Sequence, residues 1–251
     1  MKDVTGSVRH LHRLIVSNVW LLDGGPGDRW IVDTGHFAER PTLILELRAA
    51  GLRPSDLTGV LLTHRHSDHA GNAAWLQRQG VRVYAHRADA EVLAKRAPRP
   101  PLDVRAIARA GDRLGALFAA IENAMPAASI EVDRALEHGD TVAGLEVHWV
   151  PGHTEGSVFF LHEPTRALLS GDTLLAAHPP LTIKKGLAMP YPGYAVDLDQ
   201  AFTSLYAFHD RAVRYEHLLA GHGPALVGGA RERVLELLER HRPGLPSHPA
   251  T

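Results

Sequence analysis

Apolar residues in the first third of this chain form short runs that alternate with a helical pattern. Residues 11–22, 29–34, 60–63 and 81–85 are runs of strand character, and the first two are joined by the Gly- and Asp-rich turn 23–28. Residues 40–50 repeat their apolar positions at helical spacing and stop near Gly51. This alternation predicts an α/β protein in which helices pack on sheets.

Residues 87–126 interrupt the strand pattern. Two helical stretches, 88–96 and 104–125, flank the segment Pro98-Arg99-Pro100-Pro101. We interpret the region as a helical insertion and expect it to pack on the surface. The alternatives are a cap that shapes a pocket or a contact in a homodimer.

Strands are predicted again at residues 145–150, 157–162 and 167–170. Residues 176–197 are rich in Pro, Gly and Tyr and have little periodicity, so we expect a long irregular loop of the kind that often carries function. Residues 198–209 and 229–241 are predicted helices, and the tail 243–251 is predicted to be frayed.

A cluster of imidazole and carboxylate side chains follows the strand predicted at residues 60–63. It reads His64-Arg65-His66-Ser67-Asp68-His69, and these side-chain types are ligands of zinc and similar divalent metals. Residues 64 and 66 lie on one face of an extended segment. A helix is predicted over residues 70–79, with Ser67 or Asp68 as its N-cap.

Three further candidate ligands follow predicted strands later in the chain. They are His153 in Pro151-Gly152-His153-Thr154, Asp172 in Ser170-Gly171-Asp172-Thr173 and His222 in Gly221-His222-Gly223. Each lies beside glycine, which permits a sharp turn at the end of a strand. A single such ending is typical of an ordinary turn, but four in one chain indicate a common metal site.

Composition narrows the functional classes. The 251 residues include 27 basic and 28 acidic side chains and no Cys. The charge balance argues against a nucleic-acid partner, and the lack of Cys excludes disulfides, a thiolate nucleophile and Cys metal ligands. Length is compatible with one domain over residues 1–251. We see neither a membrane-spanning run nor a signal peptide, so we expect a cytoplasmic protein with no membrane partner.

These motifs together resemble the metallo-β-lactamase superfamily. The resemblance covers about residues 15–225 and includes Asp33-Thr34-Gly35, the segment 63–71, Gly152-His153-Thr154, Gly171-Asp172-Thr173 and Gly221-His222-Gly223. It implies a four-layer αββα sandwich, in which two mixed β-sheets are flanked by helices. The β-lactamase subclasses that use a cysteine ligand are excluded, because the chain has no Cys.

The resemblance also implies a role for each candidate side chain. His64, His66 and His153 would hold one metal, Asp68, His69 and His222 would hold a second, and Asp172 would bridge the two. Asp33 would brace the ligand loop without binding metal, although the Asp-Thr-Gly turn alone fits an ordinary turn equally well. Thr154 and Ser157 would orient the loop around His153.

The chemistry that such a site implies is hydrolysis. Two divalent ions can share a hydroxide that attacks a carbonyl or phosphoryl centre. Asp172 would keep the two metals together, and Asp68 would orient the nucleophile or carry a proton. We expect two zinc ions, with Mn, Fe and Co as alternatives. The expected substrate is a small ester, thioester or lactone, and the substrate-pocket candidates come from the predicted loop: His178, Lys184, Lys185, Tyr191 and Tyr194.

Several related activities stay open at this point. Glyoxalase II-like thioesterases usually carry a Gly- and Cys-containing segment after Gly-Asp-Thr, whereas this chain has Leu174-Leu175-Ala176-Ala177. Quorum-signal lactonases use a tyrosine for which Tyr191 or Tyr194 would serve. A persulfide dioxygenase would bind a single iron and would be an oxidoreductase. A phosphodiesterase or ribonuclease of the superfamily is a further alternative, because endoribonuclease relatives end in a similar Gly-His-Gly-Pro, but the neutral net charge argues against RNA.

Overall fold

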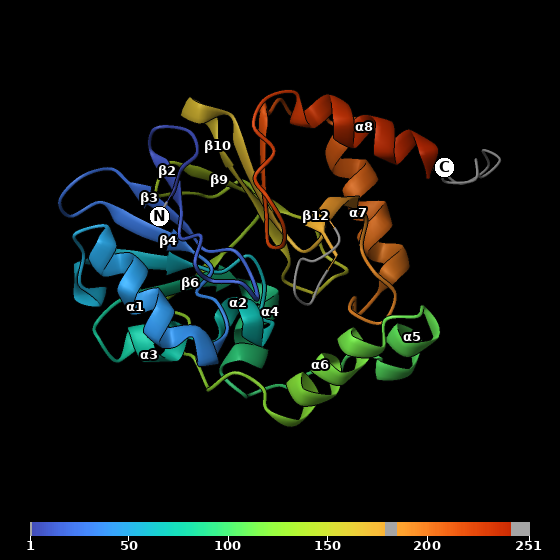
Figure 1. The fold of residues 1–251 in the computed structure, drawn as a ribbon, viewed down its shortest axis with the longest axis horizontal. Coiled ribbons are helices and arrows are strands. Elements are labelled where there is room, and N and C mark those ends of the chain that lie inside the picture. Colours follow the sequence, from blue (N-terminus) through green and yellow to red (C-terminus); the bar gives the residue numbers. More distant parts are fainter. Residues whose placement is uncertain (1, 179–184, 242–251) are drawn as a thin grey trace.

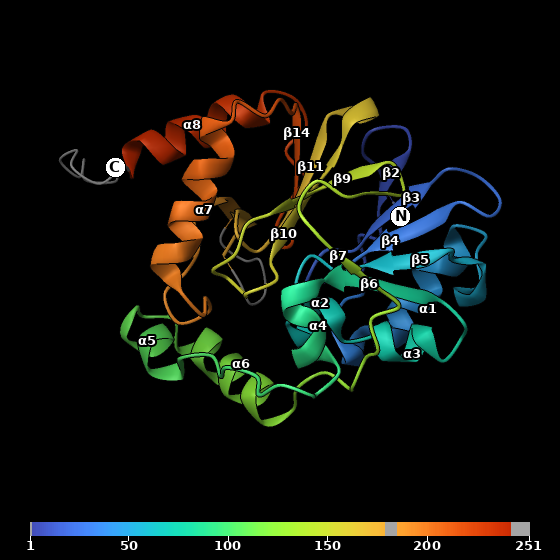
Figure 2. The same ribbon diagram turned by 180° about the vertical axis from the view of Figure 1, so that it is seen from behind.

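The computed structural model describes residues 2–178 and 185–241. Two β-sheets pack face to face, and helices cover the outer face of each sheet (Figure 1 and Figure 2). The helices α5 and α6 lie apart from these layers, at the edge where the two halves of the chain meet. The predicted αββα sandwich is confirmed.

The first sheet has seven strands in sequence order. Strands β1 to β4 pair antiparallel, and β4 to β7 pair parallel. The strand predicted over residues 11–22 is wrong for most of its length, because residues 11–19 form a loop that the Leu11 N–H closes on the Val19 carbonyl at 3.0 Å. The strands are β1 (Lys2–Asp3), β2 (Val8–His10), β3 (Trp20–Asp23), β4 (Arg29–Val32), β5 (Gly59–Leu61), β6 (Arg82–His86) and β7 (Arg134–Leu136).

The second sheet has five strands in the order β14-β11-β10-β9-β8, with only β11 and β14 parallel. They are β8 (Thr141–Val142), β9 (Leu145–Trp149), β10 (Val158–His162), β11 (Ala167–Gly171) and β14 (His217–Ala220). The predicted irregular loop over residues 176–197 is wrong in part. Strands β12 (Leu175–Ala177) and β13 (Lys185–Ala188) pair antiparallel within it.

Eight α-helices occupy the described part of the chain. The predicted helix over 104–125 is two helices, because the chain turns at Gly111, where φ is +88°. The predicted helix over 70–79 begins at Ser67 instead, with His66 as its N-cap, and breaks at residues 71–72. The helices are α1 (Arg40–Ala49), α2 (Ser67–Ala70), α3 (Ala73–Gln77), α4 (Arg87–Leu93), α5 (Val104–Arg109), α6 (Arg113–Ala124), α7 (Leu198–Asp210) and α8 (Ala230–Arg240).

The strands alternate their side chains between two cores. Trp20, Val32 and Phe160 fill the space between the sheets. Their sequence neighbours point outward, so that Ile31 packs with residues of α1 and Phe159 with residues of α7 and α8. Side chains alternate between the two faces of any strand, and because both faces are buried here, consecutive residues of these strands are apolar. The rigid sheets therefore fix the strand ends from which the candidate ligands project.

Two features of the helices bear on function. Helix α4 contacts β6 and β7, whereas α5 and α6 share a small core of their own, which includes Leu102, Ile107 and Ala119. Within the described residues, no helix is both long and apolar enough to cross a membrane.

Candidate metal centre

The first cluster of candidate ligands consists of three buried histidines. His64 and His66 follow β5, and His153 follows β9. Nε2 of His153 lies 3.2 Å from Nε2 of His64 and 3.0 Å from Nδ1 of His66. Burial, reinforced by neighbouring imidazoles, lowers the pKa of each, and that of His153 falls to about 4. Neutral imidazoles whose nitrogens converge present the lone pairs that a metal requires.

The second cluster joins two carboxylates to two imidazoles. Nε2 of His222 lies 3.2 Å from an oxygen of Asp68 and 3.2 Å from an oxygen of Asp172, and Nε2 of His69 is 3.3 Å from Asp172. Burial alone would raise the pKa of both carboxyls, but the imidazoles outweigh it and hold both well below the usual range. Burial likewise opposes protonation of His222, yet the carboxylates raise its pKa to about 9.

Asp172 lies between the two clusters. Its Oδ2 is 3.2 Å from Nε2 of His222 in the second cluster and 3.8 Å from Nε2 of His153 in the first. Asp172 follows β11, and Gly221 follows the neighbouring parallel strand β14. A Cβ at Gly221 would lie 2.2 Å from Oδ1 of Asp172, so only glycine allows the two turns to meet this closely.

Asp33 braces the second cluster from behind. It is buried, and its φ of +61° is a conformation that Asp tolerates better than most residues. Its carboxylate accepts hydrogen bonds from the Thr63 N–H at 2.8 Å, the Thr63 hydroxyl at 2.8 Å and Nδ1 of His69 at 2.8 Å. The bond to Nδ1 fixes the tautomer and turns Nε2 of His69 toward the cluster.

A second buried carboxylate, Asp89 on α4, braces the turn that carries His153. It accepts hydrogen bonds from the Thr154 hydroxyl at 2.8 Å and the Gly156 N–H at 2.9 Å, and the Arg65 guanidinium lies 3.5 Å away. Ser157 also accepts the Thr154 N–H at 2.9 Å. Burial raises the pKa of Asp89 to about 6. Nothing in the sequence distinguishes this Asp from a surface residue of an amphipathic helix.

The loop over residues 11–19 braces the turn that carries His222. Asn18 donates from its side-chain amide to the carbonyls of Ala220 at 2.9 Å and Gly223 at 2.7 Å, and its N–H donates to the carbonyl of Gly221 at 2.7 Å. The bond to Ala220 joins residues 202 positions apart in the chain. These contacts also explain why residues 11–19 leave the sheet.

The two clusters fit metal ions. Nε2 of His69, Nε2 of His222 and Oδ1 of Asp172 are buried, and none has a partner with hydrogen-bond geometry within the described part of the chain; they approach the opposite charges only as ion pairs at 3.2–3.3 Å. Buried polar atoms without partners are costly, and a bound cation would satisfy all three. The nitrogen and oxygen donors suit zinc and its neighbours among the divalent metals. All seven candidate ligands belong to these two groups.

A cavity of about 260 Å³ lies beside the clusters and reaches α6 of the insertion. Its wall includes His66, Asp68, Asp172 and His222 on one side and Phe118, Ile121 and Glu122 of α6 on the other. The insertion therefore contributes side chains to the wall of a cavity at the candidate site, as the capping alternative expects.

The substrate-pocket candidates from the predicted loop lie in different places. Tyr194 lines the cavity, and its hydroxyl donates to Asp112 at 3.3 Å. His178 and Tyr191 contact each other with ring centres 5.0 Å apart, and neither belongs to the cavity wall. Lys185 is exposed on β13, and Lys184 falls outside the described residues.

Known proteins resemble this chain in sequence and fold. The chain is 34% identical over 241 residues to a hydroxyacylglutathione hydrolase of Anaeromyxobacter dehalogenans, covering 92% of this chain and 76% of the relative. Among solved structures, the metallo-beta-lactamase family protein TTHA1429 from Thermus thermophilus superposes with a TM-score of 0.66 at 28% identity, covering 94% of this chain and 79% of that one. TTHA1623, solved in a di-iron-bound form, matches with a TM-score of 0.59 at 28% identity, covering 86% and 92%.

The family model of the metallo-beta-lactamase superfamily matches residues 12–213. That span contains six of the seven candidate ligands, and the sandwich fold of the two solved neighbours extends over most of the chain. The chain therefore belongs to the metallo-beta-lactamase superfamily and carries His and Asp clusters suited to divalent metal ions.

Proposed function

We propose that this protein is a metal-dependent hydrolase of a small ester, thioester or lactone, and that it uses two divalent ions, with zinc the expected metal. The observation that carries the proposal is the pair of donor clusters joined by Asp172 beside a single cavity. A hydroxyacylglutathione hydrolase at 34% identity supports hydrolysis of an acyl bond. A neighbour solved with two irons supports a centre of two metals.

Each candidate ligand would have a defined role in metal binding or in the reaction. His64, His66 and His153 would hold one ion, and Asp68, His69 and His222 the other, with Asp172 shared between them. Bound divalent ions would supply Lewis acidity and a nucleophile from water at neutral pH. Asp68 lines the cavity, so its carboxylate is placed to orient water and to accept a proton. The chain needs no serine or cysteine nucleophile for this chemistry.

Rigid support is the second contribution of the chain. Asp33, Asp89 and Asn18 each tie one ligand turn to a different part of the fold. Ligands held in this way need little rearrangement during the reaction. The cavity wall from α6 would exclude water from the other side of the substrate.

Replacement of Asp172 tests the proposal. Protein loaded with zinc would be assayed on thioesters, lactones and phosphodiesters, and Asp172→Ala should lower turnover of the best substrate at least a hundredfold. The matched control is Asp199→Ala, because Asp199 is exposed in the first turn of α7 and should leave turnover unchanged. Turnover of an acyl substrate by Asp172→Ala at the wild-type rate would contradict the proposal.

A further inference from the structure

The cavity beside the metal centre has one polar wall and one apolar wall. The apolar wall consists mainly of side chains from α6 and the segment before α5, namely Leu102, Phe118, Ala119, Ile121 and Met125. Glu122 of α6 is the one carboxylate on this side, and it accepts a hydrogen bond from Arg99. A pocket of this composition binds an apolar group and orients it through a few polar contacts at one end. Here the polar end is formed by the candidate metal ligands.

The apolar wall continues along α6 to solvent. Leu114, Leu117, Ile121 and Met125 follow one another at steps of three and four residues, so they share one face of the helix. They are 43%, 57%, 42% and 54% exposed. Ile121 and Met125 line the cavity, and the other two extend the same face away from it. A contiguous exposed apolar stripe that leads into a pocket is typical of a binding surface.

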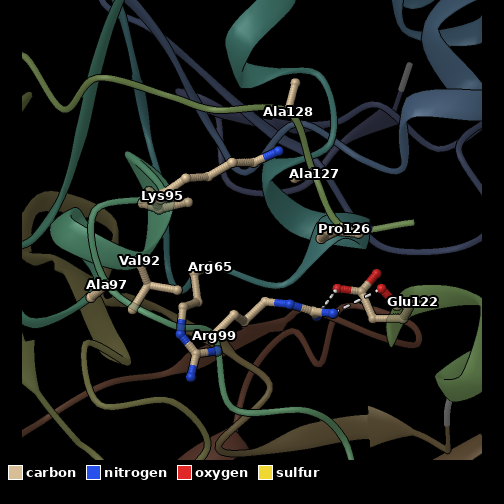
Figure 3. Close-up of a pocket in the computed structure, with 10 residues that line it drawn as sticks. Arg65, Val92, Lys95, Ala97, Arg99, Glu122, Pro126, Ala127 and Ala128 are labelled. Atoms are coloured by element: carbon tan, nitrogen blue, oxygen red, sulfur yellow. Dashed lines mark hydrogen bonds and ion pairs between the residues drawn. The ribbon is translucent and has the colours of Figure 1, made fainter. Parts of the chain in front are cut away.

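Positive charge is kept away from this cavity. Within the described residues, no Lys or Arg belongs to its wall. Arg65, Lys95 and Arg99 instead line a second cavity of about 280 Å³ (Figure 3). Glu122 lines both cavities. Arg99 donates to the Glu122 carboxylate at 2.8 Å, and Arg65 donates to Glu155 at 2.7 Å. The two arginines are thus neutralised and do not face the metal centre with free charge.

We propose that the cavity binds an apolar acyl group of the substrate and that α6 sets its preferred length. This inference rests on the proposed hydrolase function and names its substrate class: neutral esters, thioesters or lactones of medium-length apolar acids. In the reaction the oxygen of water bonds to the carbonyl carbon and the carbon–sulfur or carbon–oxygen bond breaks. The thiol or alcohol leaves with one proton of the water, and the other is released as the carboxylate forms.

The volume of the cavity sets the expected length. At about 30 Å³ per water-sized group, a cavity of 260 Å³ holds about eight or nine such groups. An acyl chain of about eight carbons would fill it, and a longer chain would run over Leu117 and Leu114. Each methylene buried in the cavity should raise kcat/KM up to about fourfold, and methylenes beyond about eight carbons should add little.

A series of thioesters tests this expectation. Acyl-N-acetylcysteamines from acetyl to dodecanoyl would be assayed with the metal-loaded full chain, next to glutathione thioesters of the same acids. We expect kcat/KM to rise steeply to about octanoyl and then to level off. Glutathione thioesters should be hydrolysed no faster than the neutral ones. Equal kcat/KM for acetyl and octanoyl thioesters in the wild-type protein would overturn the inference.

Two variants locate the effect on α6. Ile121→Ser should flatten the rise of kcat/KM with chain length, because it places a hydroxyl on the apolar wall. Leu45→Ser is the matched control: Leu45 is 53% exposed on α1, away from the cavity wall, and the rise should stay as in the wild-type protein. An unchanged rise in Ile121→Ser, with its metal content intact, would contradict the assignment of α6.

Failure of the proposed function would be recognised separately. If no ester, thioester or lactone is hydrolysed by the metal-loaded protein, the hydrolase proposal fails, and binding then decides the inference about the cavity. Calorimetric titration with acetate and octanoate should show octanoate at least tenfold tighter. Equal affinities for acetate and octanoate would contradict an acyl site, whether or not the protein is a hydrolase.

Discussion

Replacement of Asp33 by Asn would change the position of one proton in the second ligand cluster and would otherwise alter the site little. The Asn side chain keeps an acceptor oxygen for the Thr63 N–H, which Asp33 now binds at 2.8 Å. It also tolerates the φ of +61° at this position. The other carboxylate oxygen, which accepts from Nδ1 of His69 and from the Thr63 hydroxyl at 2.8 Å each, becomes an NH₂ group that can only donate. The Thr63 hydroxyl can turn to the remaining oxygen, which is 3.1 Å away, but Nδ1 of His69 has no such alternative.

The substitution would change the protonation of Nε2, on the far side of the His69 ring. Facing a donor, Nδ1 of His69 must become the acceptor, so the ring proton moves to Nε2, the nitrogen that faces Asp68 and Asp172. A protonated Nε2 cannot bind a metal. Loss of such an outer hydrogen bond typically weakens metal affinity 10–100-fold, or about 1.4–2.7 kcal/mol. The effect should fall mainly on one ion, because Asp33 makes no hydrogen bond to His64, His66 or His153 among those described. The Thr63 hydroxyl, which contacts Nδ1 of His64 at 3.0 Å, can still donate to the remaining oxygen of residue 33.

Competitive titration with a chromophoric zinc chelator would measure both affinities. We expect Asp33→Asn to bind one zinc as the wild-type protein does and the other 10–100-fold more weakly. Asp199→Asn, an exposed amide at the start of α7, is the control and should bind both ions normally. Two zinc ions held by Asp33→Asn with wild-type affinities would refute the reasoning about the tautomer of His69.

Three other substitutions probe other parts of the account. Gly221→Ala places a Cβ 2.2 Å from Oδ1 of Asp172 and should lower metal affinity at least tenfold. Gly228→Ala, whose added Cβ has no atom within 4 Å, should leave metal affinity unchanged. Equal metal affinities of the two variants would contradict this. Because burial raises the pKa of Asp89 from 3.8 to about 6, its contribution to stability is present below pH 3.8 and lost as pH rises to 6, by about 3 kcal/mol. Measured by urea unfolding without metal, the free energy of unfolding of Asp89→Asn should therefore rise relative to that of the wild-type protein between pH 4 and 7. A difference between the two proteins that does not change with pH would argue against this. Phe160→Ala should lower the free energy of unfolding by about 3–5 kcal/mol, since Phe160 is fully buried between the sheets, and a loss under 1 kcal/mol would show that the inter-sheet core repacks.

The sequence allowed the candidate ligands to be grouped into one expected site because they follow strands. Short-range patterns locate strand ends, and His, Asp and Gly gather at four of them in this chain. In a sandwich fold those ends meet at one edge, which is where the structure brings His64, His153 and His222 into one site. The resemblance to a known family supplied the order of the ligands and the fold.

The supporting residues were harder to predict because their roles depend on distant partners. Asp89 looks like one polar position of a helix until the turn 151–157 packs on it. Asn18 lies in an apolar stretch that suggests a strand, but its hydrogen bonds to the turn after β14 pull the chain out of the sheet. The role of α6 as a cavity wall depends on where the insertion lies relative to the edge of the two sheets, and helical periodicity gives no sign of that.

Metal content is the most direct test of the central claim that two donor clusters joined by Asp172 hold two ions. Protein purified without added metal, and the same protein reconstituted with zinc, would be measured by elemental mass spectrometry against protein concentration. We predict two divalent ions per chain in the reconstituted protein, with zinc the main metal in the untreated one. A single iron per chain that zinc does not displace or supplement would contradict the claim and would favour oxygen-dependent sulfur chemistry instead.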